Sequence, residues 1–355
     1  MHNLWLRAAM IRAIRRFFEQ RHYLEVETPL LIPAPAPEPH LLPQRAGKWF
    51  LQTSPEICMK RLLARGIPRI YQICKCFRRQ ERGRRHLPEF TMLEWYRAGA
   101  DYYDLMAECE ELLPAVAAAL AGAAPDGPGR ALNRRAGAVG QTAAEQGDGD
   151  VTDHGVPHLA ASETAMRTSV REPARSPQDV VPRDRLHGDG ISLLPPWQRL
   201  TVAEAFRRYA GLEVQEALRQ ERFEQLLVEK IEPRLGRQRP TFLYDYPAEL
   251  GALARLSPHN PAVAERFELY IAGIELANGF SELNDPVEQQ CRFTRDRAAI
   301  RAAGRRPPPL PRRFLEELHA MPPAAGIALG IDRLAMFFAG AESIDQLQAF
   351  TPEQL

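Results

Sequence analysis

Two β-forming runs that flank a short charged loop constrain the fold more than any other feature of the sequence. Residues 70–78 (IYQICKCFR) and 90–98 (FTMLEWYRA) are rich in aromatic and β-branched side chains, and the loop between them holds four arginines. Two such runs separated by a loop are typical of an antiparallel hairpin. Strands do not alternate regularly with helices, as they would in a doubly wound parallel sheet. The sequence therefore predicts an α+β fold in which helices flank an antiparallel sheet.

The remaining periodicity predicts helices and strands on both sides of this hairpin. Leu4, Ile11, Ile14 and Phe18 recur at the spacing of one helical face, which predicts an amphipathic N-terminal helix. The other predicted elements are a short strand and extended loop over 23–39, a helix over 103–119 with a proline as kink or boundary, a helix near 222–232, strands over 241–247 and on both sides of Ala272-Gly273, and a glycine-led helix over 326–340.

Residues 121–195 differ in kind from the rest of the chain. They are rich in Ala, Gly, Asp, Arg and Pro, and no aromatic ring occurs between Tyr103 and Trp197. Such a composition buries too little apolar surface to offset the entropy lost on ordering. We expect a disordered insertion that divides one domain into residues 1–120 and 196–355.

Composition limits the class of protein. The formal net charge is only +1, which argues against a chain that binds polyanions with its whole surface and leaves local basic patches open. The five cysteines lack the spacing of a disulfide framework or of a zinc site, so we expect free thiols. No apolar run reaches the roughly 18–20 residues of a membrane span, and the N-terminal residues lack the apolar region typical of a signal peptide. A cytoplasmic protein that makes no membrane contact is expected.

The hairpin carries side chains suited to bind phosphate and a flat ring. Arg78 ends the first run, where a rigidly held guanidinium can bind a phosphate through two hydrogen bonds. His86 lies in the loop, and Phe90 begins the return strand, where a ring can stack on a nucleobase. Phe90, Glu94 and Tyr96 share one face by the period of two. Taken alone, a solvated surface hairpin explains these residues equally well.

Two glutamates further along suggest a cation site. A hairpin with an even-numbered loop places Glu268 and Glu275 on the same face, where they repel unless a cation joins them. Oxygen ligands suit Mg²⁺. Asn278 and Glu282 alternate onto one face, but Glu275 has the other parity. A common pocket therefore requires a bulge, for which Gly279 is the candidate. Two solvent-facing glutamates are the alternative.

The segment GIALGIDR is the third candidate. Gly330 lets a backbone approach a ligand, and Arg333 stands in the first turn of an apolar helix, where it can cover a base or stabilise phosphate charge. A core helix with a buried Asp332-Arg333 pair is the alternative reading. No serine has a recognisable base and orienting partner around it.

These segments, preceded by a proline-containing strand, resemble the three motifs of class II aminoacyl-tRNA synthetases. YLEVETPLL, with Pro29, resembles the first motif, FRRQERGRRHLPEFTMLEWY the second and GIALGIDR the third. TSPEICMKRLL (53–63) and GIELANGFSELND (273–285) resemble the lysyl subgroup. The resemblance implies a class II synthetase-like catalytic domain interrupted by the insertion.

Within that subgroup the chain is most similar to the lysyltransferases that modify elongation factor P. The TSPE, LEWYR and IELANGF segments match that family, and Ala328 stands where the tRNA enzymes carry glycine. The chain begins about one helix before the first motif, which leaves no room for an anticodon-binding domain. A truncated lysyl-tRNA synthetase and a weakly active or inactive regulatory paralogue that binds lysine or ATP are the alternatives.

The resemblance implies a reaction and its participants. We expect ATP-dependent formation of an aminoacyl-adenylate from (R)-β-lysine or lysine, and transfer of the acyl group to a lysine side chain of elongation factor P. Two arginines and Mg²⁺ would bend ATP and neutralise its charge, so that no side-chain nucleophile is needed. A homodimer is expected, and tRNA is not expected as a partner.

The resemblance also implies roles for single residues. Arg78 and Arg333 are the expected catalytic pair, and Glu268 and Glu275 are the expected Mg²⁺ ligands. The expected ATP-binding residues are Arg78, Gln80, His86, Leu87, Phe90, Glu275, Leu276, Gly330 and Arg333. The residues expected to hold the amino acid are Ser54, Pro55, Glu56, Glu94, Tyr96, Asn278 and Glu282.

Two positions depart from the family pattern. Gln80 stands in place of a glutamate, so the charge is lost and the hydrogen-bonding ability stays. Leu87 stands in place of an asparagine, which removes a polar contact to the nucleotide. Each loss costs on the order of 1–3 kcal/mol of binding if nothing compensates for it.

Overall fold

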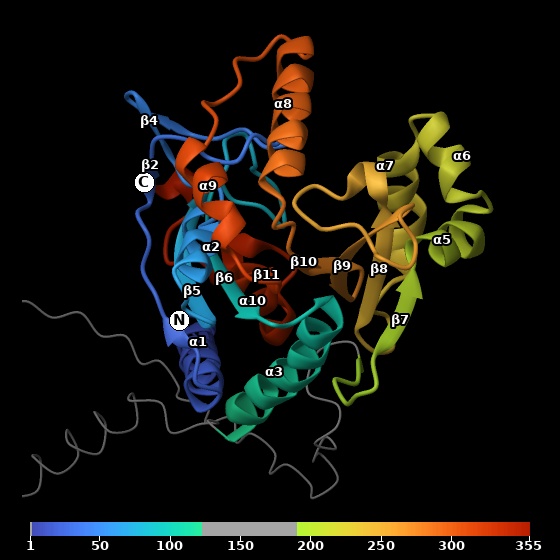
Figure 1. Cartoon of the computed structure of the whole chain (residues 1–355). Helices are drawn as coiled ribbons and strands as arrows, with labels where there is room; N and C mark the ends of the chain where they lie inside the picture. Colours follow the sequence, from blue (N-terminus) through green and yellow to red (C-terminus); the bar gives the residue numbers. More distant parts are fainter. Residues whose placement is uncertain (1, 123–189) are drawn as a thin grey trace, which may run out of the picture. The chain divides into compact units, whose positions relative to one another are not determined.

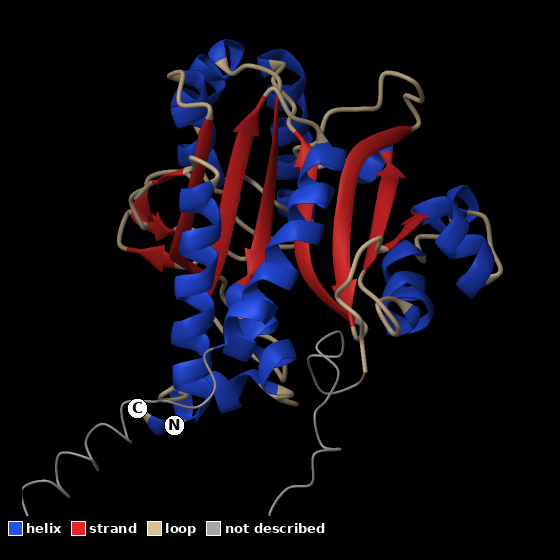
Figure 2. Ribbon diagram, turned by 90° about the horizontal axis from the view of Figure 1, so that it is seen from below, coloured by secondary structure: helices blue, strands red, loops and turns tan. Residues whose placement is uncertain are grey.

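An eight-stranded sheet organises the computed structural model, which describes residues 2–122 and 190–355 (Figure 1). The strands, in spatial order, are β1 (Leu24–Glu25), β5 (Arg69–Phe77), β6 (Glu89–Ala98), β11 (Ala324–Gly330), β10 (Ile274–Ser281), β9 (Val263–Ile271), β8 (Thr241–Pro247) and β7 (Gln198–Thr201). The two outermost pairs are parallel and the five inner pairs are antiparallel. Figure 2 shows helices lying across this sheet, which confirms the predicted α+β class.

Both hairpins predicted from the sequence form the centre of the sheet. β5 and β6 pair from Arg69 opposite Arg97 to Phe77 opposite Glu89. β9 and β10 are joined by Ala272 and Gly273 alone, and both have positive φ, 55° and 72°. Two consecutive residues with positive φ form the tight turn whose twist suits a two-residue hairpin.

The bulge that the common pocket requires lies next to Glu275 and not at Gly279. Glu275 pairs with Tyr270 and Ala277 with Leu269, so Leu276 is the extra residue. The prediction of a bulge at Gly279 was wrong, because Gly279 lies in regular strand pairing between β9 and β10. A glycine is needed there because the neighbouring strand packs closely against it. A Cβ at Gly279 would lie 2.7 Å from the ring of Phe267 in the neighbouring strand.

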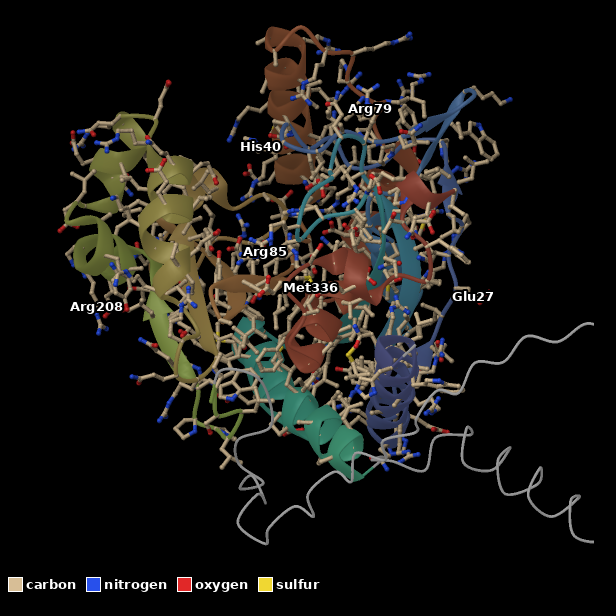
Figure 3. The ribbon with its side chains drawn as sticks, turned by 180° about the vertical axis from the view of Figure 1, so that it is seen from behind. Glu27, His40, Arg79, Arg85, Arg208 and Met336 are labelled. Carbon is tan, nitrogen blue, oxygen red and sulfur yellow. The ribbon has the colours of Figure 1, made fainter. Side chains whose placement is uncertain are left out.

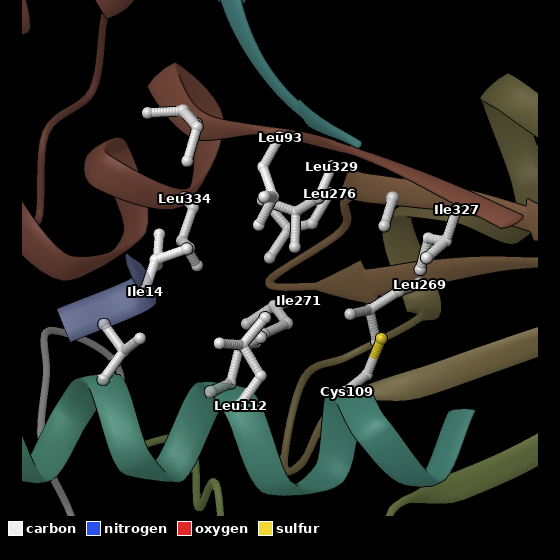
Figure 4. Packing of buried hydrophobic residues seen from close by; sticks show 14 of the residues in the cluster. Ile14, Leu93, Cys109, Leu112, Leu269, Ile271, Leu276, Ile327, Leu329 and Leu334 are labelled. Atoms are coloured by element: carbon white, nitrogen blue, oxygen red, sulfur yellow. The ribbon is translucent and has the colours of Figure 1, made fainter. Parts of the chain in front are cut away.

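The main hydrophobic core lies between the sheet and three helices: α1 (His2–Gln20), α3 (Tyr102–Gly122) and α10 (Ile331–Ala339). Pro114 lies inside α3 and does not end it. Glu27, just after β1, and Arg208, in the helical turn over Phe206–Ala210, lie toward opposite ends of the sheet (Figure 3). Figure 4 shows Leu112 and Cys109 of α3 pointing toward the strands across this core. Burial of these apolar side chains is the main term that stabilises the arrangement.

The opposite face of the sheet is covered only in part. α2 (Glu56–Ala64), α8 (Pro286–Ala302) and α9 (Arg312–Glu317) contribute to a smaller hydrophobic cluster at the β5–β6 end. A small sheet of β2 (Leu31–Ile32), β4 (Trp49–Leu51) and β3 (Arg45–Ala46) stands beside them. α5 (Val202–Ala205), α6 (Val214–Arg219) and α7 (Phe223–Leu226) pack on the β7–β8 end, and short helical turns carry α7 on to Arg234. Polar side chains of the central strands lie between the two clusters.

The segment 326–340 is half strand and half helix. The prediction of one helix was wrong for Gly326 to Gly330, which form β11 between β6 and β10. Small residues are required there, because a Cβ at Gly326 would lie 2.2 Å from the ring of Tyr96. The helix begins at Ile331, so Arg333 does lie in its first turn, as predicted.

The predicted insertion falls mainly outside the described residues, which leave out 123–189. At its edges, α3 continues to Gly122, and Ile191 and Leu193 are buried in the main core. In the described parts, no helix combines the length and the apolar character needed to span a membrane.

Candidate active site

The polar residues predicted from separate motifs lie in one row across the sheet. Glu94 pairs with Ala328, Ala328 with Asn278, and Asn278 with Glu268, so these four side chains share a face. The bulge at Leu276 turns Glu275 onto the same face, opposite Tyr270. The open face of the central strands is therefore the candidate site.

One end of the row is a buried cluster of polar side chains at the N-terminus of α2, called the pocket below because of the role proposed for it. Ser54 donates a hydrogen bond to Glu94 (Oγ to Oε2, 2.9 Å) and accepts one from the backbone N–H of Glu56 (3.0 Å). The hydroxyl of Tyr96 donates to the other oxygen of Glu94. Pro55 is the residue before the first turn of the helix. The TSPE segment thus places the predicted amino-acid ligands around Glu94.

A lysine that the sequence reasoning missed lies at the bottom of this pocket. The side chain of Lys60 is completely buried, and its ammonium forms ion pairs with Glu56 and Glu282. The ammonium also lies 5.1 Å from the centroid of the Phe280 ring. The signal was present in the sequence: Lys60 follows Glu56 by four residues, which places both side chains on one face of α2.

The pocket holds more carboxyl groups than cations. Glu56, Glu94 and Glu282 surround a single internal cation, Lys60. Burial, followed by the charge of Glu56, raises the pKa of Glu94 to about 8. Burial also raises the pKa of Glu282 to about 8, although Lys60 opposes that rise. Buried carboxylates without paired cations are costly, so the pocket is suited to a ligand that brings two ammonium groups.

Arg78 and Phe90 form the next part of the row. The guanidinium of Arg78 lies 5.0 Å from the centroid of the Phe90 ring. Its Nε is buried and has no hydrogen-bond partner among the residues that the structure describes. A buried donor without an acceptor is expensive unless a ligand supplies one, and a phosphate oxygen is a suitable acceptor.

Arg333 joins the second and third motifs. Its Nη1 donates to the backbone oxygen of Glu275 (2.8 Å) and to Oε2 of the same residue (3.2 Å). Its Nη2 donates to Nε2 of His86 (2.5 Å). Burial, followed by the charge of Arg333, lowers the pKa of His86, which favours the neutral ring that accepts this bond. Three residues predicted to contact ATP therefore lie together.

Asp332 does not pair with Arg333. Its carboxylate accepts a hydrogen bond from the backbone N–H of Thr91 (2.7 Å) and forms an ion pair with Arg7 (3.1 Å). The reading of these two residues as a buried pair was wrong, because neighbours on a helix point in different directions. Arg333 is left facing the site.

The two predicted metal ligands differ in their surroundings. Glu268 accepts hydrogen bonds from Arg266 (2.7 Å) and from the hydroxyl of Tyr270 (2.6 Å), whereas the carboxylate of Glu275 accepts a hydrogen bond only from Arg333 among the described residues. Burial and the charge of Glu275 raise the pKa of Glu268, so the two carboxylates are close enough to interact. Within the described ranges, no group of three or more acidic, histidine or cysteine side chains has an arrangement that could hold a metal ion by itself. The pair fits a cation that takes its remaining ligands from phosphates and water.

Three of the predicted ATP-binding positions do not present side chains to this cluster. Gln80 is exposed in the β5–β6 loop, with φ of 68°. Leu87 and Leu276 are buried in the main core behind the sheet. A nucleotide contact at Leu87 or Leu276 would involve backbone atoms. The leucine that stands at position 87 in place of the family's asparagine packs in the main core.

Glu38 is a further carboxylate that the sequence reasoning missed. It stands between prolines in the segment before β3, and its carboxyl shows no ion pair or hydrogen bond with the described residues. Burial raises the pKa of Glu38 to about 7, and the charges of Arg78, Glu56 and Arg266 act on it. These neighbours show that Glu38 faces the site. A lone glutamate in a proline-rich loop offers no periodic signal from which this could be predicted.

Comparison with known proteins agrees with this geometry. A family model described as tRNA synthetases class II (D, K and N) matches residues 1–354. Proteins named elongation factor P–(R)-beta-lysine ligase, from Vibrio campbellii and Salmonella gallinarum, are 37% identical to this chain, and the one from Erwinia tasmaniensis is 38% identical. Each alignment covers 99% of this chain and 95% of the relative. The chain therefore belongs to the class II tRNA synthetase family (D, K and N), among the elongation factor P–(R)-beta-lysine ligases.

Proposed function

We propose that the protein activates (R)-β-lysine or lysine with ATP and transfers the acyl group to a lysine side chain of elongation factor P. The observation that carries the proposal is the pocket in which Glu56, Glu94 and Glu282 surround one internal cation, Lys60. Lysine and β-lysine each bring two ammonium groups, the number needed to pair the two carboxyl groups that the pocket holds in excess of Lys60. The relatives' name supplies the acceptor protein.

In the first step a carboxylate oxygen of the amino acid attacks the α-phosphorus, and pyrophosphate leaves. Glu94 and Glu282 hold the ammonium groups, so the substrate carboxylate points along the row toward Arg78. The free Nε of Arg78 then takes a phosphate oxygen and stabilises the charge of the transition state. His86 and Arg333 hold the outer phosphates. The protein acts by positioning and charge and forms no covalent bond to the substrate.

In the second step the amine of the acceptor lysine attacks the carbonyl carbon of the adenylate, and AMP leaves. The amine must lose a proton to become a nucleophile. Phe90 and Gly330 border the place proposed for the adenosine, on the same face of the sheet as the amino-acid pocket. Glu268 and Glu275 would hold Mg²⁺, which neutralises phosphate charge when it is bound.

We further propose a homodimer in the cytoplasm. Large apolar side chains are exposed around the first motif: Leu24, Leu30, Leu31 and Trp49. Exposed apolar side chains grouped on one surface are typical of a surface that binds another chain. All five cysteines are free thiols, which suits a reducing compartment.

The reaction is tested by incubating the protein with ATP, Mg²⁺, (R)-β-lysine and purified elongation factor P, then measuring the factor's intact mass. A gain of one lysyl group is expected, and none without ATP. Pyrophosphate exchange that depends on the amino acid reports the first step alone. Exchange combined with charging of tRNA and an unmodified factor would instead support a tRNA synthetase. Absence of both exchange and transfer would exclude both enzymes.

A further inference from the structure

A group of arginines that outnumbers the neighbouring carboxylates follows β10 and Glu282 in the chain. Between residues 286 and 313 the sequence holds eight arginines and only two carboxylates, Glu288 and Asp296. The remainder of the chain holds 38 basic and 43 acidic side chains. The positive charge of the protein is therefore concentrated in this one segment, which forms α8, the loop after it and the start of α9.

Some of these arginines hold the structure together. Arg292 pairs with Glu288 (2.8 Å) and donates to the backbone oxygens of Ala252 (2.9 Å) and Ala254 (2.8 Å). Arg305 donates to the backbone oxygen of Pro39. Both are at least partly buried, so their charge has a structural explanation.

Five others have no such explanation and define what we call the arginine surface. Each is exposed and has no ion pair or hydrogen bond from its side chain to any described residue. They are Arg295, Arg301, Arg306, Arg312 and Arg313. Five like charges in one segment repel one another, and a partner with negative charge would relieve that repulsion.

The arginine surface adjoins the pocket. α8 begins four residues after Glu282, and Arg292 fastens it to Ala254, whose backbone pairs with Glu282. At its far end, Arg305 fastens the segment to Pro39, next to Glu38 of the site. Figure 1 shows α8 beside the segment that carries β2 and β4, and Figure 3 shows His40 of that segment against α8. A macromolecule seated here reaches the pocket.

We propose that the arginine surface docks an acidic face of the protein acceptor while the acceptor lysine enters the pocket. The inference rests on the proposed function. Two observations favour a protein over a single-stranded nucleic acid. Phe293, the one Phe, Tyr or Trp of this segment, is buried, as is Phe314 directly after it, so the segment itself offers no ring for bases to stack on. The cations also flank a site that must receive a side chain from outside.

Charge reversal separates docking from activation. One variant carries Arg312→Glu and Arg313→Glu, and a second carries Arg295→Glu, Arg301→Glu and Arg306→Glu. Amino-acid-dependent pyrophosphate exchange should be unchanged in both, because no substituted residue faces the pocket. The KM for elongation factor P should rise about tenfold or more, since close charge pairs across interfaces contribute about 1.5 kcal/mol upward. The rise should shrink at high salt.

A control variant with Arg208→Glu and Arg222→Glu makes the same charge change as the first variant at exposed positions on the β7–β8 end of the sheet. Its KM for the factor should stay within twofold of the parent's. Equal losses in control and test variants, or unchanged transfer in both test variants, would overturn the proposal. So would loss of binding to a single-stranded oligonucleotide with transfer unaffected.

Direct titration of elongation factor P into the full chain distinguishes a failure of the docking proposal from a failure of the proposed function. A parent chain that exchanges pyrophosphate but neither binds nor modifies the factor overturns the docking proposal and leaves activation intact. A parent chain without exchange overturns the proposed function. Binding of the factor that is lost in the two test variants and kept in the control would still support the arginine surface in that case.

Discussion

At the scale of single residues, buried charge decides what the pocket can bind. The raised pKa values of Glu94 and Glu282, both about 8, favour protonation of these carboxyls near neutral pH when no ligand is bound. Two ammonium groups of a substrate favour the ionised carboxylates and so displace those protons. The raised pKa values of these carboxyls therefore indicate a site suited to a ligand with two positive charges.

Amino-acid binding should therefore strengthen as pH rises. Below pH 8 each bound ligand must displace protons from Glu94 and Glu282, so affinity should increase up to about tenfold per pH unit per proton and level off above pH 8. Calorimetry of lysine binding in buffers of different ionisation enthalpy measures the protons released. A proton count of zero at neutral pH would contradict the assignment. Glu94→Gln should lower the count.

Lys60→Met should destabilise the protein. Removing the cation leaves Glu56 and Glu282 unpaired, and loss of one partner from a buried ion pair costs about 3–5 kcal/mol. Protonation of the carboxyls relieves the loss, so it should be smaller near pH 6 than near pH 8.5. Urea unfolding at the two pH values tests this. Addition of Glu282→Gln to Lys60→Met should restore part of the stability, and an equal loss at both pH values would argue against a charge effect.

Two glycines of β11 should respond differently to a methyl group. The atoms nearest to a Cβ at Gly330 belong to the side chain of Arg333, at 3.7 Å, so Gly330→Ala should fold normally and weaken ATP binding by blocking the ligand's approach. A Cβ at Gly326 would strike Tyr96 at 2.2 Å and Glu282 at 2.4 Å, so Gly326→Ala should cost about 1–3 kcal/mol of stability. Thermal melts and the KM for ATP separate the two effects. A normal KM in Gly330→Ala would remove that residue from the site.

At the scale of elements, turn chemistry and strand periodicity made the two hairpins predictable, because both signals are local. The bulge at Leu276 was not predictable, since it depends on how β10 fits β9 and β11 at once. β11 was read as helix because GIALG carries no alternation. Its small side chains make sense only between β6 and β10, where Tyr96 and Glu282 leave no room at Gly326.

The β5–β6 loop is held by the C-terminal segment, which gives it a testable role. Arg82 pairs with Asp345 (3.1 Å) and Glu353 (2.8 Å), and the backbone oxygen of Arg84 accepts from Ile344 (2.8 Å). Arg82→Ala should raise the KM for ATP about two- to fivefold, with little change in melting temperature, because exposed ion pairs contribute little to stability. High salt should mimic the substitution in the parent chain. If neither Arg82→Ala nor high salt changes the KM for ATP, the ion pairs to the C-terminal segment are not needed to hold the β5–β6 loop.

At the scale of the whole molecule, the proposed homodimer carries its own prediction. Leu31→Lys with Trp49→Lys places charge on two exposed apolar positions near the first motif and should yield monomers in sedimentation experiments. Leu194→Lys with Phe350→Lys changes two other exposed apolar positions and should leave the mass unchanged. A parent chain that sediments as a monomer would disprove the dimer.

The sequence by itself determined the fold class, the two hairpins and most of the row, because Glu94, Tyr96, Arg78 and the lysyl-type segments are local patterns. Only the tertiary structure decided which residues meet. In the structure, Lys60 and Glu38 lie in the site, and the side chains of Leu87 and Leu276 lie in the core. The bulge lies at Leu276. The physical reason is that burial and charge pairing depend on contacts between segments far apart in the chain, which no single stretch encodes.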